Sequence, residues 1–414
     1  MLKNTWTISQ TTEAALYRLL TAQNSIPENT PPAYTCSFLN SLGAVKGAHW
    51  NRLLIDNSPF LKHEFLYALE RNDCLGEKYG WYPHHLIVRD QNQQVIAASP
   101  LYVKTNSYGE FVFDWSWASA YEQVGLSYYP KFVASVPYTP VTGSRLLIMP
   151  EIPAQQKNKI AATMIDATIR EAERLNMSGM HWLFNLDEEC KFYRQSNLML
   201  RLGCQYHWHN QNYECFDHFL DGLVSRKRKK IRRERRFVRD QQIHIRRLHG
   251  SELDDVLWQQ VHSFYVNTFY RKNSLPTLSL GFFKELGAMM GSQVLLVLAF
   301  YDKKLIACAI NFLDDSTLYG RFWGCMDKFH GLHFEACYYQ GIEYAIEHQL
   351  SFFEPGAQGE HKISRGFLPT KTWSAHWISD SRLRAAIGDF CQREERLMQH
   401  ECKELMSLSP YRVN

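Results

Sequence analysis

Two stretches that lie half a chain apart in this 414-residue sequence share one pattern. "LIVRDQNQQVIAASPLYVKTNSYGEFVFDW" begins at residue 86, and "LLVLAFYDKKLIACAINFLDDSTLYGRFWG" begins at residue 295. Each reads as an apolar run, a polar turn, a longer apolar run, a second turn and a strand containing YGxF. The turn residues Asp90 and Asp302 lie 212 positions apart, and Gly109 and Gly320 lie 211 apart. This spacing predicts two three-stranded antiparallel meanders, one in each half.

The segments that follow the meanders also correspond. A helical stretch comes next in each half, and then a strand with a Pro/Gly loop, "KFVASVPYTPVTGSRLLI" or "SFFEPGAQGEHKISRGFL". Antiparallel strands, a helix and a further strand follow one another in this order in the GNAT acyltransferase fold. We therefore predict an α+β chain of two tandem GNAT-like domains, with mixed, mainly antiparallel sheets flanked by helices. Each domain is expected to have its own sheet, with a splayed strand pair near the Pro/Gly loop.

The predicted domains span residues 1–217 and 218–414, each about the usual length of a domain. The first 35 residues or so, which include "SIPENTPPAYT", are predicted to form a loosely attached arm. No basic region followed by an apolar core opens the chain, and no apolar run has the length of a membrane span. We expect a cytoplasmic protein, and the sequence predicts no oligomeric state.

The sequence resembles the FemAB-like predicted N-acyltransferases of bacteria over about residues 48–400. Three stretches carry the resemblance: "SYGEFVFDWSWASAYEQVGLSYYPKFVASVPYTPVTGSRLL", "SRKRKKIRRERR" and "LHFEACYYQGIEYAIEHQLSFFEPGAQGEHKISRGFLPT". It implies kinship with enzymes that add amino acids to peptidoglycan precursors from aminoacyl-tRNA. It thus implies transfer of an acyl or aminoacyl group to an amine-bearing substrate, with aminoacyl-tRNA or acyl-CoA as co-substrate and no resident cofactor. Peripheral contact with a membrane-linked precursor would follow.

The loop "EPGAQGEHKISRGFLP", residues 354–369, combines acid, base and anion-binding side chains. Acyl transfer to an amine needs a proton acceptor and groups that stabilise an oxyanion. Glu360 and His361 are the candidate proton acceptors here. Glycines that let backbone N–H groups approach a substrate, and cations that hold phosphate or carboxylate, complete the set: Gly356, Gly359, Lys362 and Arg365. The alternative is a rigid turn whose charges are solvated or paired with each other.

Asp114 is a third catalytic candidate. It ends the predicted strand "EFVFD" among aromatic residues, where burial would raise its pKa and suit a base. The alternative is an N-cap of the helix that follows. We also assign Arg321, Glu335 and Tyr338 to substrate binding, although an acid in a first helical turn, as at Glu335, commonly serves the helix dipole.

A CoA-binding GNAT domain has a pyrophosphate loop at the start of the helix in the second half. At the corresponding spacings this sequence has Lys328, Gly331 and His333, and only the central glycine matches. This departure argues against acetyl-CoA as the donor.

A basic helix is predicted at residues 218–240. Its segment "RKRKKIRRERRFVR" holds ten basic residues and one acidic residue, whereas the whole chain has a net charge of only +4. Apolar residues recur along it at helical spacing: Leu220, Leu223, Val224, Ile231 and Val238. We assign four of its arginines to phosphate contacts with tRNA or another polyanion: Arg232, Arg233, Arg235 and Arg236. The alternative is a solvated helix that bridges the domains.

Two other functions compete with the enzyme. A protein of this fold that has lost its chemistry would bind nucleic acid or another polyanion, and a membrane-surface protein would place the basic helix on anionic lipid. The loop at Glu360 favours the enzyme, because a binding protein has no need of it. His207 and His209 form an HxH pair without further ligands at suitable spacing, so we predict no metal site.

Overall fold

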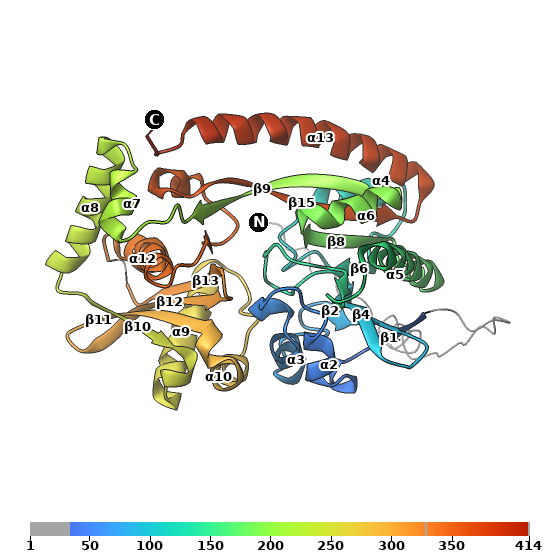
Figure 1. Cartoon of the computed structure of the whole chain (residues 1–414), viewed down its shortest axis with the longest axis horizontal. Coiled ribbons are helices and arrows are strands. Elements are labelled where there is room, and N and C mark those ends of the chain that lie inside the picture. The colour runs from blue at the N-terminus through green and yellow to red at the C-terminus, as the bar shows by residue number, and fades with distance from the viewer. Residues whose placement is uncertain (1–33, 328, 413–414) are drawn as a thin grey trace.

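The computed structural model describes residues 34–327 and 329–412 (Figure 1). Apart from its last two residues, the predicted N-terminal arm lies outside this part, as does Lys328. The two halves of the chain lie side by side, and the long C-terminal helix α13 (Ser381–Ser407) runs across both. The fold is α+β, with two tandem GNAT-like halves, as the sequence predicts. Within the described ranges, no helix combines the length and the apolar character needed to cross a membrane.

The second half contains the predicted antiparallel meander. Asp302 and Lys303 both have positive φ angles, as a tight I′ turn between its first two strands requires. A helical segment then returns the chain to a strand parallel to the third one. The elements of this half up to that strand are β10 (His244–His249), α9 (Asp255–Arg271), α10 (Leu280–Met289), β11 (Val294–Tyr301), β12 (Lys304–Leu313), β13 (Thr317–Cys325), α11 (Leu332–Phe334), the π-turn η6 (Glu335–Tyr339), α12 (Gln340–Glu347) and β14 (Phe352–Glu354).

In the first half, the predicted three-stranded meander is only partly correct. Its hairpin exists, but residues 110–114 form no strand, because Gly109 and Phe111 both have positive φ angles that break the extended backbone. The strand that pairs with Leu101–Lys104 is instead Lys131–Ala134, which follows an additional helix, Trp115–Gln123. The elements of this half are β1 (Thr35–Leu39), α2 (Gly47–Asn51), α3 (His63–Arg71), β2 (Trp81–Pro83), β3 (His85–Arg89), β4 (Val95–Ser99), β5 (Leu101–Lys104), α4 (Trp115–Gln123), β6 (Lys131–Ala134), β7 (Leu147–Ile148), α5 (Ala154–Arg174), β8 (Gly179–Asn185), α6 (Cys190–Gln195) and β9 (Met199–His209).

The expectation of two separate sheets is wrong. Hydrogen-bonded strands run in the order β10-β11-β12-β13-β14-β9-β15-β8-β6-β5-β2, where β15 is Leu368–Ile378, and β1, β3, β4 and β7 form a second, smaller sheet. The halves join because each sends one strand to the other. β9 pairs with β14, β15 pairs with β8, and β9 and β15 pair with each other. Each half has a parallel strand pair before its Pro/Gly loop, β6 with β8 and β13 with β14, at the place where a splayed pair was predicted.

The predicted basic helix is two helices. The chain forms α7 (Phe216–Asp221) and then α8 (Ser225–Asp240), with a break between them at residues 222–224. The predicted domain boundary at 217/218 falls inside α7. Figure 1 shows α8 at the outer end of the second half, away from the first half.

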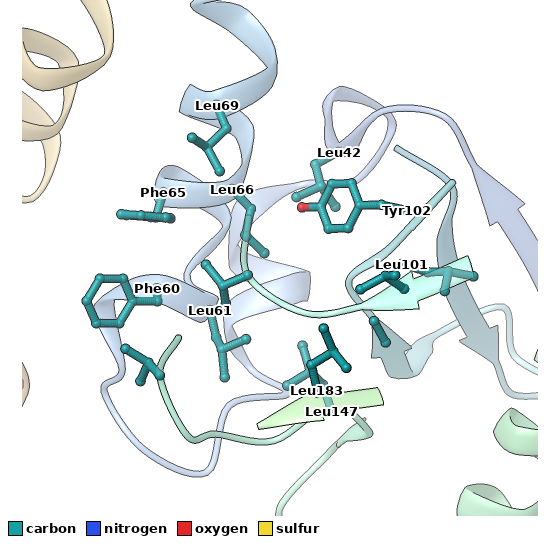
Figure 2. Packing of buried hydrophobic residues seen from close by; sticks show 14 of the residues in the cluster. Leu42, Phe60, Leu61, Phe65, Leu66, Leu69, Leu101, Tyr102, Leu147 and Leu183 are labelled. Carbon is teal, nitrogen blue, oxygen red and sulfur yellow. The ribbon is translucent and has the colours of Figure 1, made fainter. Parts of the chain in front are cut away.

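The main core continues from the first half into the second. Figure 2 shows side chains of α3 and the preceding turn η2 (Pro59–Leu61) packed towards β5, β7 and β8. Burying each large apolar side chain contributes about 1.5–3 kcal/mol. The ring of Phe60 also lies 5.2 Å from that of Phe312 and 5.1 Å from that of Tyr319, centroid to centroid, in β12 and β13. This packing fixes the first half against the strand that carries Arg321.

Candidate active site

A cavity of about 560 Å³ lies between the two halves. The second half contributes parts of α9, β12, β13 and η6 to its wall. The first half contributes Ser107, Tyr108, Gly109, Phe111, Phe113, Trp115, Tyr138 and Pro140, but not the predicted catalytic residue Asp114. Residues 355–358 of the predicted Pro/Gly loop complete the wall.

The cavity opens where two parallel strands separate. The last pair of β13 and β14 is Tyr319 with Glu354, and the next residues on each strand, Gly320 and Pro355, already line the cavity. In the first half, β6 and β8 also separate, but the chain after β6 fills that gap. Arg145 lies fully buried there and donates to three backbone carbonyls. The second half therefore holds the open site.

Arg321 is the cation at the separation of the strands. Its guanidinium carbon lies 5.0 Å from the ring centroid of Phe60 and 5.9 Å from that of Tyr319. Nη1 donates to the carbonyl of Gly320 at 3.1 Å, whereas Nε and Nη2 are buried and have no partner among the described residues. Burial lowers the pKa of Arg321 to about 10, although Glu354 opposes this shift.

Glu354 ends β14 directly before Pro355, where the cavity wall begins; its own side chain is not among the lining residues, but its charge acts on Arg321. Burial raises its pKa to about 7, Arg321 opposes the rise, and Asp314 adds to it. Oε2 is buried without a partner in the described part of the chain, and Oε1 lies 3.9 Å from His207 Nδ1. A carboxyl with a pKa near neutrality can accept a proton and give it up again at physiological pH.

The Pro/Gly loop has the backbone that its glycines suggested. Gly356 and Gly359 have φ angles of +93° and +115°, which L side chains rarely adopt. Lys362 Nζ donates to the carbonyl of Gly356 at 2.6 Å, and burial lowers the pKa of Lys362 to about 7. This bond joins the loop to the 3₁₀-helix η7 (Glu360–Arg365) that follows it.

The two predicted proton acceptors of this loop do not line the cavity. Glu360 and His361 are exposed at the start of η7. His361 Nε2 lies 3.0 Å from the hydroxyl of Tyr338, which does line the cavity. Burial and the neighbouring cations Arg365 and Lys362 lower the pKa of His361. The catalytic role of Glu360 and His361 stays a prediction.

The expectation of a raised pKa for Asp114 is wrong. Burial raises its pKa, but the ammonium of Lys131 and further neighbours outweigh burial and bring the pKa to about 2. Asp114 also accepts from the hydroxyl of Tyr128 at 2.6 Å, and it precedes α4 without a side-chain capping bond. Lys131 donates in addition to Glu110 at 2.8 Å. This buried cluster fixes the loop that forms the first half's side of the cavity.

That loop presents aromatic side chains at the cavity. Phe111, Phe113 and Trp115 line the cavity and are 42%, 54% and 46% exposed. Tyr108, also in the lining, contacts Trp115 edge to face. Exposed aromatic groups in such number are uncommon on a monomer and mark a contact surface.

Helix α8 has an inner and an outer face. Ile231 and Val238 are buried on the inner face, where the single acidic residue of the segment, Glu234, also lies. Arg365 donates to Glu234 at 2.8 Å and Tyr339 bonds the same carboxylate, so η7 and α8 are joined. On the outer face, exposed cations recur at helical spacing: Arg226, Lys229, Arg232, Arg233, Arg236 and Arg239.

The four arginines assigned to phosphate contacts differ in their surroundings. Arg233 and Arg236 are exposed and make no ion pair with the described residues. Arg232 is half exposed and pairs with Asp217 at 3.0 Å. Arg235 pairs with Glu335 at 3.1 Å and Glu343 at 2.9 Å, which raises the pKa of Arg235 after the cost of burial.

A second hollow, of about 590 Å³, lies between α8 and the strand β10. Its cations come from the same helix, and Glu335, predicted to bind substrate, lines this hollow rather than the cavity between the halves. Glu335 accepts from Gln340 of α12 as well as from Arg235 of α8, so both of its carboxylate oxygens are engaged between these helices. Of the residues predicted to bind substrate, Gly356, Arg321 and Tyr338 do line the cavity.

Glu354 is the residue that sequence reasoning missed. It opens the quoted loop, but nothing in its neighbours distinguishes it from Glu360, because its burial depends on β9 of the other half. Its position as the last strand residue before the Pro/Gly loop is the sequence feature from which it could have been predicted. In the part of the chain that the structure describes, no group of three or more His, Cys, Asp or Glu residues could hold a metal ion.

The fold and the site together define a tandem GNAT-like protein whose open cavity lies at the separation of β13 and β14. The structure is similar to that of FemX, with 10% identity, a TM-score of 0.51, and coverage of 82% of this chain and 98% of that one. It is also similar to the C-terminal domain of a putative lysylphosphatidylglycerol synthetase from Agrobacterium fabrum, with 8% identity, a TM-score of 0.49, and coverage of 82% and 94%. Likenesses at such identities concern the fold alone.

The chain belongs to the FemAB-like family, described as peptidoglycan biosynthesis/recognition, whose model matches residues 41–413. Membership of this family points to acyl or aminoacyl transfer in peptidoglycan-related processes. No curated protein sequence matches the chain.

Proposed function

We propose that this protein transfers an aminoacyl group from aminoacyl-tRNA to an amine of a peptidoglycan precursor, in the cavity where β13 and β14 separate. The observation that carries the proposal is the position of Glu354, a largely buried carboxyl directly before the cavity-lining Pro355, whose pKa is raised to about 7. The crystallised relative FemX has the same fold, and the family description names peptidoglycan.

The proposed reaction forms one amide and breaks one ester. The amine nitrogen attacks the carbonyl carbon of the aminoacyl ester, and the bond from that carbon to the ribose oxygen breaks. The proton lost by the amine ends on the ribose oxygen. Glu354 takes the proton first and returns it to the leaving oxygen, a double role that a pKa near 7 permits.

The backbone supplies the proposed oxyanion site. Gly356 and Ala357 line the cavity, and their N–H groups donate to no other group in the described ranges. Free N–H groups held in a rigid loop are suited to a tetrahedral oxyanion, because they need no reorganisation during the reaction. The positive φ of Gly356 and the bond from Lys362 hold this part of the loop in place.

The outer face of α8 supports a polyanionic donor. Cations without carboxylate partners, such as Arg233 and Arg236, repel each other unless an anion lies near. A row of phosphates provides such anions, whereas the single 3′-phosphate and pyrophosphate of CoA require fewer cations. The hydrogen bond from Arg365 to Glu234 joins α8 to η7, the 3₁₀-helix that directly follows the Pro/Gly loop of the cavity. A polyanion-binding protein without chemistry would account for α8 but not for Glu354.

The proposal is tested by comparing Glu354→Gln with Glu360→Gln in purified protein that transfers a labelled amino acid from charged tRNA. The structure-based assignment expects Glu354→Gln to lower kcat by about 10²–10⁴-fold, while Glu360→Gln has little effect. A loss confined to Glu360→Gln would transfer the role to the residue predicted from the sequence. Equal rates in both variants and the wild type would reject general-base catalysis by this loop.

A further inference from the structure

Arg321 carries an unoccupied binding edge. A guanidinium presents Nε–H and Nη2–H side by side, and this edge fits the two oxygens of a carboxylate. In Arg201 the edge is occupied by Glu394, at 2.6 Å from Nε and 2.8 Å from Nη2. Arg174 holds Glu171 in the same way, at 2.7 Å from both nitrogens. In Arg321 these two nitrogens are the ones that are buried without a partner among the described residues.

An arginine that only supports the fold looks different, as Arg145 shows. It lies at the corresponding separation of strands in the first half, and Nε and Nη2 each donate to a backbone carbonyl at 2.7 Å. Leaving a buried donor unpaired is destabilising, and more so for a charged group. The first half meets this requirement with its own backbone. In the second half no carbonyl of the described residues accepts from Nε or Nη2, so a ligand is the available partner for this edge of Arg321.

We propose that Arg321 binds a carboxylate of the acceptor, beside the amine that is acylated, so that the acceptor presents an α-amino acid group to the cavity. The inference rests on the proposed function, because it specifies the acceptor at that same site. Glu354 is the natural partner for the amine, since its Oε2 is also buried and unpaired in the described part. No ion pair within the described ranges joins Arg321 to Glu354, although Arg321 follows two residues after Tyr319, the residue that pairs with Glu354 between β13 and β14.

A carboxylate fits this edge better than a phosphate. Arg321 lies against the rings of Phe60 and Tyr319, and Glu354, with a pKa raised to about 7, compensates its positive charge only in part. The nearby Lys362 already donates to a carbonyl, and burial lowers its pKa to about 7, so it adds little further charge. One planar anion with a single negative charge therefore balances the site, whereas a phosphate dianion would not.

The test uses two probes that differ by one carboxylate. Nα-acetyl-lysine amide has a distal carbon that carries an amine alone. The matching amide of Nα-acetyl-diaminopimelic acid carries an amine and a carboxylate on its distal carbon. Binding of each probe to the full-length protein is measured by calorimetry or ligand-observed NMR, without tRNA. We expect the second probe to bind about 10- to 100-fold more tightly, the range of a charge-assisted hydrogen bond to a carboxylate.

Substitutions test whether Arg321 causes the difference in affinity between the two probes. Arg321→Gln should remove the preference and leave both probes equally weak, Arg321→Lys should keep part of it, and Arg170→Gln, at an exposed position on α5, should keep all of it. Glu354→Gln should weaken both probes alike, because both carry the amine. Thermal unfolding checks that each variant is folded.

Equal affinity of the two probes for the wild type would overturn the inference, as would a preference that survives Arg321→Gln. Displacement of the probes by inorganic phosphate at lower concentration than by acetate would overturn the choice of carboxylate. Aminoacyl transfer to acceptors with and without the carboxylate at equal rates would reject the inference while leaving the proposed function intact. A probe preference without any transfer would reject the proposed function alone.

Discussion

Arg365 Nη2 donates to both carboxylate oxygens of Glu234, at 2.8 Å and 3.0 Å, in a buried ion pair between η7 and α8. Glu234 is the single acid in a segment with ten cations, and this contact explains its presence. Arg365 was predicted to bind substrate. Its guanidinium instead lies 3.5 Å from the ring centroid of Phe334 and is bonded to Glu234 and Tyr339, so it holds the basic helix to the candidate site.

Breaking this pair should destabilise the protein strongly. Arg365→Met removes the bidentate partner of the buried Glu234 and leaves it the more exposed Lys230 at 3.9 Å, and removal of one partner of a buried pair costs about 3–5 kcal/mol. The double variant Glu234→Leu, Arg365→Met should recover much of the loss, because no isolated charge then remains. Urea unfolding of the two single variants and the double variant measures the coupling. Additive losses would show that the pair does not act as a unit.

The outer and inner arginines of α8 should respond differently to substitution. Arg233→Gln removes an exposed phosphate contact, so the slope of log K against log salt for tRNA binding should fall by about 0.7–0.9. Arg235→Gln removes the partner of Glu335 and Glu343 and should lower the unfolding temperature while changing the slope little. Fluorescence titrations between low and physiological salt measure the slopes. A larger slope change for Arg235→Gln would contradict the division into two faces.

The buried Glu110 should make stability fall as pH rises. Burial raises its pKa from 4.5 to about 7, with Lys131 opposing the rise. Between these pH values the folded state binds a proton that the unfolded state has lost, so the free energy of unfolding decreases as pH increases from 4.5 to 7. A shift of this size corresponds to roughly 2–4 kcal/mol. Glu110→Gln should remove this part of the decline, whereas Glu122→Gln, at an exposed position, should not.

The reaction rate should rise with pH through the pKa of Glu354. A base works in its deprotonated form, so kcat/KM is expected to increase up to about pH 7 and then level off. The rising limb should disappear in Glu354→Gln. Lys362 also has a pKa of about 7, and Lys362→Met serves as the comparison. If the rise in rate with pH persists in Glu354→Gln but vanishes in Lys362→Met, the titrating group is the Lys362 ammonium rather than Glu354.

Local sequence patterns predicted most elements of the fold. The tight turn at Asp302 and the amphipathic helices were visible because their signals lie within a few residues of each other. The first half's third strand was misplaced because YGEF has the composition of a strand. Its residue Glu110 is instead drawn to Lys131, 21 positions later in the chain.

The candidate site was predicted only in part for the same reason. Arg321 and Gly356 were recognised, but the exchange of β9 and β15 between the halves has no local signature. That exchange buries Glu354 and leaves Glu360 exposed, although the two residues share one loop. The raised pKa of Glu354 thus depends on strands distant in the sequence.

The most direct measurement of the central claim is mass spectrometry of a peptidoglycan stem peptide incubated with the protein and charged tRNA. The account predicts that the peptide gains the mass of one amino acid residue, that uncharged tRNA and acetyl-CoA give no product, and that Glu354→Gln slows the gain by about 10²–10⁴-fold. A peptide unchanged by charged tRNA, or acetylated from acetyl-CoA, would contradict it.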